Sequence, residues 1–316
     1  MQSLTTLRIG TRRSALALWQ THYVRDTLRT MYPSLVVELV HMTTTGDRVI
    51  DRPLPEIGGK GVFTQELEDA LRTGAIDLAV HSLKDLPTEI DRAFTLGAIP
   101  PRAAPFDALV SRGGHTLATL PDGATVGTSS LRRRAQLLAA RPDLRTQDLR
   151  GNVDTRLRKA ADPAGPYDAI VLAVAGLERL GRADAISEVL DTDEIMLPAP
   201  GQGAIAVQCR ADDATTRDLL AALDHRATRL AVAAERAFLA GLEAGCRLPV
   251  SAYATLADGE IRMVGRVSDL DGAQPITVRG TAAEDDADAL GGRLADEALG
   301  LGAAALLDAV KRGLPE

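Results

Sequence analysis

The chain has 316 residues, 45% of them hydrophobic, and this size and composition predict a globular protein of two or three domains. Its formal net charge of −7 argues against nucleic acid as the main partner, because binding to a phosphate backbone rests on a basic surface. No stretch approaches the roughly 20 apolar residues that a membrane span needs, and no basic and apolar leader is seen at the N-terminus, so we expect a cytoplasmic protein without a membrane partner.

The first third of the chain alternates β-rich runs with helical periods, an order typical of a parallel α/β sheet. The predicted elements are strands over 7–10, 35–40 and 76–82 and helices that begin at Ser14 and Thr64. In the first helix Trp19, Tyr23 and Met31 share one face at helical spacing. Because aromatic stripes at this spacing usually pack, we expect Trp19 in the core.

Prolines interrupt this alternation over 99–105 and predict a crossover into a second domain. A second α/β alternation follows, with strand-like runs over 124–129, 146–149 and 167–175 and helices from Ser130 and Asn152. Another cluster of proline and glycine, at 197–203, precedes a strand-like run that can return to the first sheet. Two crossovers of this kind would form a hinge.

From about residue 222 the pattern becomes that of a small α+β domain. A helix over 228–244 precedes strands over 249–256, 260–268 and 275–282 and two alanine-rich helices, and Asp258-Gly259 is a strong hairpin signal. The predicted fold class is α/β with three domains. Domain 1 comprises 1–99 and 200–221, domain 2 comprises 105–196, and domain 3 comprises 222–316.

Basic residues gather where the predicted strands end. In open α/β sheets ligands bind beyond the carboxyl ends of strands, where free backbone N–H groups and the helix dipole also favour anions. The residues at such places are Arg12, Lys84, Arg132, Arg133, Arg150 and Arg156. One arginine alone would more often be a solvated surface residue, but the recurrence predicts a site for several carboxylates. Within the run 132–134 we assign Arg134 to the surface.

Asp85 and the segment 127–130 each admit two interpretations. Asp85 follows Lys84 at the end of an apolar strand, so it is either a structural partner of that lysine or an ionised carboxylate that stabilises a developing cation and handles protons. The glycine and hydroxyls of 127–130 suit both oxyanion binding and ordinary helix capping.

The histidines lack metal-ligand spacing, and 58–61 lacks the rest of a phosphate-binding loop, so we predict no metal and no nucleotide.

The two cysteines, Cys209 and Cys246, are too few for a disulfide framework. Cys246 lies between Gly245 and Arg247, and a neighbouring cation favours the reactive thiolate. The residues alone leave open whether it is reactive or a simple loop thiol. Cys209 lies in a strand pattern, and we expect it to be buried and inert.

Eight motifs between about residues 7 and 256 resemble the porphobilinogen deaminase (hydroxymethylbilane synthase) family, in family order. They are LRIGTRRSALALWQ, GGKGVFTQELE, DLAVHSLKDLPT, VGTSSLRRRAQL, LRGNVDTRL, YDAIVLAVAGLERLG, LPAPGQGA and the Cys246 loop. The resemblance implies two periplasmic-binding-protein-like α/β domains around a cleft and a small C-terminal α+β domain. It also implies a monomeric transferase that joins four porphobilinogen units head to tail, releases ammonia at each step and liberates hydroxymethylbilane.

The resemblance further implies a dipyrromethane cofactor attached through a thioether, and Cys246 matches its attachment position. Asp85 matches the catalytic aspartate, which stabilises the azafulvene cation formed when ammonia leaves. The positions that bind the acetate and propionate groups of cofactor and substrate are matched by Arg12, Ser14, Lys84, Thr128, Ser130, Arg132, Arg133, Arg150 and Arg156. Gln20, Lys60 and Arg179 match family positions of less defined role. The loop AGCRLP replaces the usual GGCQ followed by an apolar residue and proline.

Two alternatives belong to other classes. A non-catalytic anion-binding protein can use the same fold, since a fold does not fix a function, and it predicts no covalent adduct on Cys246. A family member that binds pyrroles without turnover would have lost Asp85 or Cys246, and both residues are present.

Overall fold

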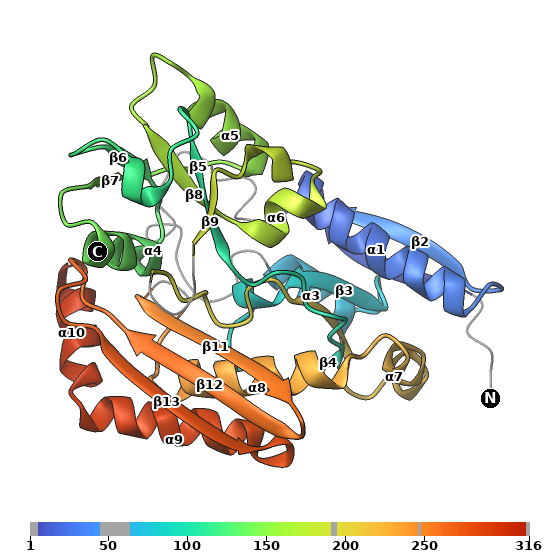
Figure 1. The fold of residues 1–316 in the computed structure, drawn as a ribbon. Helices are drawn as coiled ribbons and strands as arrows, with labels where there is room; N and C mark the ends of the chain where they lie inside the picture. Colours follow the sequence, from blue (N-terminus) through green and yellow to red (C-terminus); the bar gives the residue numbers. More distant parts are fainter. Residues whose placement is uncertain (1–5, 45–63, 191–194, 246–247, 314–316) are drawn as a thin grey trace. The chain divides into compact units, whose positions relative to one another are not determined.

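The computed structural model describes residues 6–44, 64–190, 195–245 and 248–313 (Figure 1). The chain folds into two compact units. The first comprises Met1–Arg102 and Ala204–Arg229, and the second comprises Ala103–Gly203 and Leu230–Pro315. The division into three domains and the cleft between the first two stay predictions.

The first unit contains a five-stranded sheet in the order β2-β1-β3-β10-β4. Its strands are β1 (Thr6–Arg12), β2 (Val36–Met42), β3 (Leu78–Ser82), β4 (Phe94–Ala98) and β10 (Ile205–Arg210). β1 pairs in parallel with β2 and β3, whereas β10 runs antiparallel to β3 and β4. The predicted return of the chain to the first sheet is therefore confirmed.

Helices cover both faces of this first sheet. Leucines, isoleucines and valines of the strands pack with α1 (Ala15–Met31) and α7 (Ala214–Ala221) on one face. On the other face Ala79, Phe94 and neighbouring strand residues pack with α3 (Gln65–Arg72). Ser14 caps α1 through its side chain, as the sequence predicted, and Thr64 precedes α3 without a side-chain capping bond.

The prediction that Trp19 packs in the core is wrong. Trp19 is 37% exposed and Met31 is 44% exposed, while the buried residues of the helix are Gln20, Thr21, Val24 and Leu28. The two buried polar residues find partners, since Gln20 Nε2 donates to Ser82 Oγ at 2.9 Å and Thr21 Oγ1 donates to Thr11 Oγ1 at 2.7 Å. Satisfied hydrogen bonds offset the cost of burying these polar groups. Trp19 lies at the surface and stacks on Tyr23, which is partly buried and packs against the core of the first sheet.

The second unit contains a five-stranded sheet in the order β7-β6-β8-β5-β9. Its strands are β5 (Asp107–Ser111), β6 (Thr125–Gly127), β7 (Arg145–Gln147), β8 (Ala169–Ala173) and β9 (Glu188–Leu190). β6 is parallel to β7 and β8, and β5 is antiparallel to β8 and β9. The core on one face includes α4 (Leu131–Ala140), and that on the other includes α5 (Val153–Ala161) and α6 (Val174–Arg179). In each five-stranded sheet the fourth strand in spatial order, β10 or β5, thus runs antiparallel to the third.

The two predicted crossovers meet at Ala103 and Gly203. The Ala103 N–H donates to the Gly203 carbonyl at 3.2 Å. Gly203 has a φ of +85°, and a Cβ there would lie 2.5 Å from the Ala103 carbonyl oxygen. Only glycine fits this conformation and this close approach, so the second crossover requires the glycine that the sequence supplies.

The C-terminal part of the second unit is a three-stranded antiparallel sheet with helices, as the sequence predicted. It comprises α8 (Arg226–Gly241), β11 (Val250–Ala257), β12 (Glu260–Val267), β13 (Ile276–Ala283), α9 (Ala287–Gly300) and α10 (Ala303–Gly313). Asp258 and Gly259 both have positive φ, the conformation of the predicted tight hairpin. α8 ends at Gly241 rather than near 244, and Glu243 takes a φ of 48° just beyond it.

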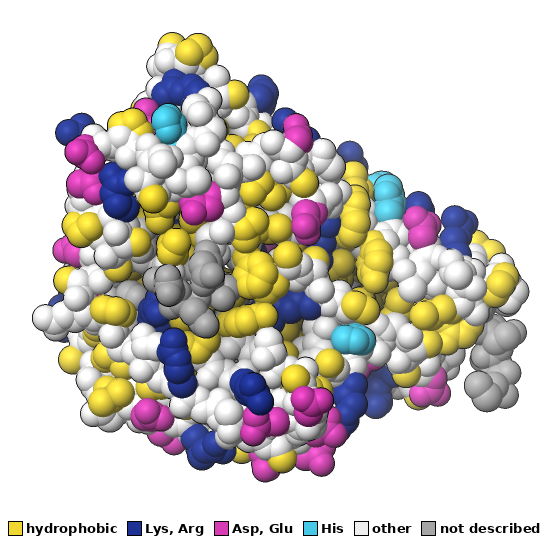
Figure 2. Space-filling view, viewed as in Figure 1, with side chains coloured by type: hydrophobic (Ala, Val, Ile, Leu, Met, Phe, Trp, Pro, Cys, Tyr) yellow, Lys and Arg dark blue, Asp and Glu magenta, His cyan; other side chains and the backbone are white. Residues whose placement is uncertain are grey.

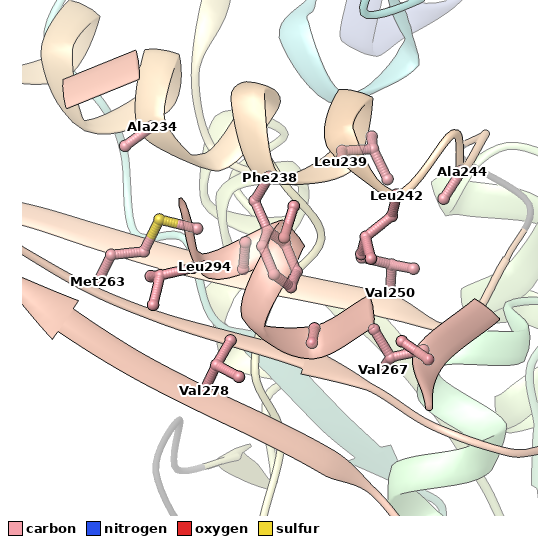
Figure 3. Close-up of a cluster of buried hydrophobic side chains, with 14 of the residues drawn as sticks. Ala234, Phe238, Leu239, Leu242, Ala244, Val250, Met263, Val267, Val278 and Leu294 are labelled. Carbon is pink, nitrogen blue, oxygen red and sulfur yellow. The ribbon is translucent and has the colours of Figure 1, made fainter. Parts of the chain in front are cut away.

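The core of this C-terminal part centres on Phe238 of α8, whose ring is fully buried among side chains of the sheet and of α9 (Figure 3). Short 3-10 helices complete the described elements, over Leu83–Asp85, Leu117–Thr119, Ala183–Ala185 and Glu284–Asp286. The fold class of two α/β sheet domains and a small α+β part is confirmed. The sequence patterns did not identify β4, β5, β9, α6 or α7.

Candidate functional site

One edge of the first sheet collects predicted site residues. Because β1 and β3 are parallel neighbours, their carboxyl ends lie at the same edge. Arg12 is the last residue of β1, and Ser14 caps α1 immediately beyond it, with its Oγ accepting from the Ala17 N–H at 3.3 Å. Lys84 and Asp85 occupy the 3-10 turn directly after β3.

The residues at this first edge differ in exposure and in hydrogen bonding. Asp85 is exposed, whereas Arg12 and Lys84 are half-buried. Gln20 is 2% exposed and its bond to Ser82 ties α1 to the end of β3. The sequence therefore brings an accessible carboxylate and two cations to one edge, with Gln20 in a position that holds the edge together.

The corresponding edge of the second sheet carries the hydroxyls predicted at 127–130. Thr128 directly follows β6, and its N–H donates to the carbonyl of Gln147, the last residue of β7, at 2.9 Å. Thr128 Oγ1 accepts from the Ser130 N–H at 3.2 Å, and Ser130 Oγ accepts from the Arg133 N–H at 3.5 Å. These hydroxyls cap the start of α4, so the capping interpretation is confirmed; anion binding at the same place stays a prediction.

Arg132 and Arg133 form a buried pair on Asp107, the first residue of β5. Arg132 is 5% exposed and its Nη2 lies 2.8 Å from Asp107 Oδ2, while Nη1 donates to the Leu197 carbonyl at 2.7 Å. Arg133 is 6% exposed; its Nε and Nη2 donate to Asp107 Oδ1 at 3.1 and 2.7 Å, and Nη1 donates to the Val171 carbonyl at 2.9 Å. Arg134 has a side chain 42% exposed, which confirms its assignment to the surface side of the run.

This arginine pair carries one more positive charge than its carboxylate partner neutralises. Burial lowers the pKa of the Arg132 guanidinium; Asp107 opposes that shift, and Arg133 adds to it. A guanidinium nevertheless remains protonated in proteins. Within the described part of the chain, this edge of the second sheet therefore carries a buried excess of positive charge.

Three further predicted arginines lie on the helices and loops of the second sheet. Arg150 and Arg156 are half-buried, and Arg156 Nε donates to the Gly151 carbonyl at 2.8 Å. Arg179, at the end of α6, donates through Nη2 to the Gly203 carbonyl at 2.7 Å. Arg179 thus contacts the second crossover.

Of the predicted cysteines, Cys209 is fully buried in β10, and burial raises the pKa of its thiol to about 11, which confirms that it is an inert thiol near neutral pH. Lys60, Cys246 and Arg247 lie outside the described residues. Within the described part of the chain, no group of three or more His, Cys, Asp or Glu side chains is placed to hold a metal ion, and no helix is long and apolar enough to cross a membrane. Acidic and basic side chains are interspersed over the face drawn in Figure 2.

The sequence motifs did not indicate roles for Asp107 and Gln202. Gln202 is fully buried, and its Nε2 donates to Asp107 Oδ1 at 2.9 Å and to the Pro105 carbonyl at 2.7 Å. A sequence signal existed, because Asp107 is a lone carboxylate at the head of the apolar run FDALV and Gln202 is the polar residue of PGQG.

Fold and site together define a class: an α/β protein with two sheets, each of which carries basic and hydroxyl side chains at its carboxyl edge. The comparisons identify the member of this class. Residues 7–218 match the porphobilinogen deaminase dipyromethane cofactor binding domain, and residues 229–300 match the porphobilinogen deaminase C-terminal domain. The second match carries the similarity beyond residue 256, where the sequence motifs end.

Curated relatives are similar over nearly the whole chain. The porphobilinogen deaminase of Roseiflexus sp. (strain RS-1) is 54% identical over 96% of this chain and 98% of its own length, and that of Roseiflexus castenholzii is 53% identical over the same shares. Among solved structures, the OxyR regulatory domain of Pseudomonas aeruginosa aligns with 69% of this chain and 95% of its own at 18% identity, with a TM-score of 0.39, too low to support an inference. The chain belongs to the porphobilinogen deaminase family.

Proposed function

We propose that the chain is a transferase that condenses four porphobilinogen units head to tail, releases ammonia at each step and yields hydroxymethylbilane. Family membership at 54% identity supports the reaction. The structural observation that carries it is the accessible carboxylate of Asp85, which lies at the same sheet edge as Arg12 and Lys84. The non-catalytic anion-binding alternative is not favoured, because it gives Asp85 no role.

The residues at each sheet edge, taken separately, suit the carboxylate groups of a dipyrromethane cofactor in charge and in hydrogen-bonding type. A dipyrromethane built from porphobilinogen carries acetate and propionate groups, and guanidinium groups bind carboxylates through paired, charge-assisted hydrogen bonds. Among the described residues, Arg132 and Arg133 share the single buried carboxylate of Asp107, which leaves one positive charge in excess. When bound, the cofactor supplies the pyrrole carbon on which the chain grows, and we assign its thioether attachment to Cys246.

We assign a separate role to each group of site residues. Arg12, Lys84, Arg150 and Arg156 hold the acetate and propionate groups, with Ser14, Thr128 and Ser130 as additional donors, while Gln20, Lys60 and Arg179 support these positions. Asp85 stabilises the cation left on the substrate when ammonia departs, because an ionised carboxylate beside developing positive charge lowers the energy of the transition state. Its exposure lets it exchange protons with the leaving group and the substrate. We further propose that the protein acts as a monomer in the cytoplasm, which light scattering and cell fractionation would test.

Intact mass and ammonia release test this function. The denatured wild-type protein should exceed its sequence mass by one dipyrrole, and Cys246→Ala should show the bare mass. Asp85→Ala should keep the adduct but lose ammonia release by roughly 100-fold or more, the range of general acid–base and charge stabilisation.

Asp91→Ala is a matched control, because Asp91 is a half-exposed carboxylate whose partner is Arg72 at 2.9 Å. It should retain both the adduct and turnover. A wild-type protein that stays at bare mass after addition of porphobilinogen would make anion binding without catalysis the better account. Substantial turnover by Asp85→Ala would remove Asp85 from the chemistry.

A further inference from the structure

Asp107 lies at the ligand edge of the second sheet because of the direction of its strand. β5 runs antiparallel to β8, and Asp107, its first residue, pairs with Ala173, the last residue of β8. The amino end of β5 therefore lies at the carboxyl edge of β6 and β8. Asp107 is fully buried there, so no ligand reaches it from solvent.

The Asp107 carboxylate connects three segments of the second unit. Arg133 contributes two donors to Oδ1, Gln202 contributes a third at 2.9 Å, and the Arg132 guanidinium lies 2.8 Å from Oδ2. Arg132 and Arg133 belong to the first turn of α4, and Gln202 belongs to the second crossover. One side chain thereby fixes the direction of both guanidinium groups and their position relative to the crossover.

The charges of this cluster imply a function for the aspartate beyond geometry. Two buried guanidinium groups with no counterion would be strongly unfavourable, since an uncompensated buried charge costs several kcal/mol. Among the described residues, Asp107 is the carboxylate that pairs with these guanidinium groups, so it neutralises one of the two charges and leaves one positive charge in excess.

We propose that Asp107 is a positioning residue, which we call the resident carboxylate of the Arg132 and Arg133 pair. It is the protein's own counterion for one of the two guanidinium charges. The second positive charge is left to bind one carboxylate of a ligand. The identity of that ligand carboxylate, an acetate or propionate of cofactor or substrate, rests on the function proposed above. The resident-carboxylate role itself depends on the charges and contacts of the protein alone.

Chemical rescue by a small carboxylate tests the proposal. Asp107→Gly removes the carboxylate and leaves space of about its size, which formate can fill. Without formate the variant should have a lowered unfolding temperature, reduced cofactor adduct in the intact mass, and a KM for porphobilinogen raised roughly tenfold or more, as for the loss of charge-assisted hydrogen bonds. Formate should restore all three, whereas formamide, which has a similar shape but no charge, should not.

Asp168→Gly is the matched control. Asp168 directly precedes β8, at the opposite end of the same sheet, and its side chain is 44% exposed beside Arg112 at 3.5 Å. Formate and formamide should act on this variant alike. Equal rescue of Asp107→Gly by both compounds, or rescue by neither, would show that Asp107 acts through packing and would overturn the proposal.

A double variant keeps the test decisive if Asp107→Gly does not fold. Asp107→Asn removes one negative charge, and adding Arg133→Gln removes one positive charge, which restores the net charge of the cluster. The double variant should therefore have a higher unfolding temperature than Asp107→Asn. If Asp107 acted through packing, the two substitutions would lower the unfolding temperature additively, and the double variant would unfold at a lower temperature than Asp107→Asn. These stability measurements need no substrate, so they stand even if wild-type protein shows no deaminase turnover, which is the separate test of the proposed function.

Discussion

Acid should destabilise the first sheet through His81, which lies in β3 and is 7% exposed. Its Nε2 is 3.1 Å from Gln208 Oε1, and Gln208 Nε2 donates to Glu68 Oε1 at 3.0 Å. Because the amide nitrogen of Gln208 is engaged by Glu68, its oxygen accepts a hydrogen bond from His81. Burial lowers the pKa of His81 to about 4; the hydrogen bond that His81 donates to Gln208 opposes the shift, and the charge of Arg12 adds to it.

The sign and size of the effect follow from proton linkage. His81 has an ordinary pKa of 6.5 in the unfolded chain and about 4 in the folded one, so the unfolded state binds the proton first as the pH falls. The stability contribution of neutral His81 is complete above pH 6.5 and is lost progressively as the pH falls towards about 4. Each unit of pKa difference corresponds to about 1.4 kcal/mol, so the loss should reach about 3 kcal/mol near the lower end.

Urea unfolding at a series of pH values across this interval measures the loss. His81→Gln keeps an amide donor for Gln208 but cannot titrate, so the wild-type free energy of unfolding should fall about 3 kcal/mol further than that of the variant. His225 lies at the surface beside Thr228, and His225→Gln should follow the wild-type curve. Parallel curves for wild type and His81→Gln, or an NMR titration of the His81 ring near its ordinary pKa, would refute the reasoning.

Two further substitutions probe the second unit. Phe238→Ala removes the fully buried ring at the centre of the C-terminal core (Figure 3). Urea unfolding should show that the free energy of unfolding falls by about 3–5 kcal/mol. A fall below about 1 kcal/mol would mean that the core closes over the space. Glu235, also fully buried, accepts from the Gly201 N–H at 2.7 Å and the Ala254 N–H at 2.9 Å. Glu235→Gln keeps the length of the side chain but turns one acceptor into a donor that faces a donor, and it should cost about 1–3 kcal/mol in urea unfolding. Unfolding of Glu235→Gln at the wild-type urea concentration would contradict this expectation.

Local chemistry made the helix starts predictable. Ser14, Ser130 and Asn152 each accept a hydrogen bond from a backbone N–H three residues on, as capping residues do. A capping bond depends on neighbours in sequence alone, so the residue type and its place before an apolar run suffice. The Asp258-Gly259 hairpin was predictable for the same reason, since its backbone conformation is set by those two residues.

Contacts distant in sequence decided the features that the sequence did not predict. α1 carries two stripes of residues with the same helical period: an aromatic one, and one that contains the polar residues Gln20 and Thr21. The polar residues of the second stripe are buried because they hydrogen-bond with Ser82 and Thr11. Arg132 and Arg133 were expected to face a ligand directly, but their immediate partner is Asp107, some 26 residues earlier in the chain. No periodicity within α4 contains that information, because the pairing exists only once β5 lies beside β8.

The two carboxylates at strand ends differ in accessibility, and this difference separates their roles. Asp85 is exposed after β3, so a substrate can reach it, and a group that stabilises a transient cation must be reachable. Asp107 is fully buried under two guanidinium groups, so it can act on a ligand only through them. Loss of Asp85 should therefore abolish turnover and spare the cofactor adduct, whereas loss of Asp107 should deplete the adduct itself, because the arginines that retain the cofactor lose their orientation.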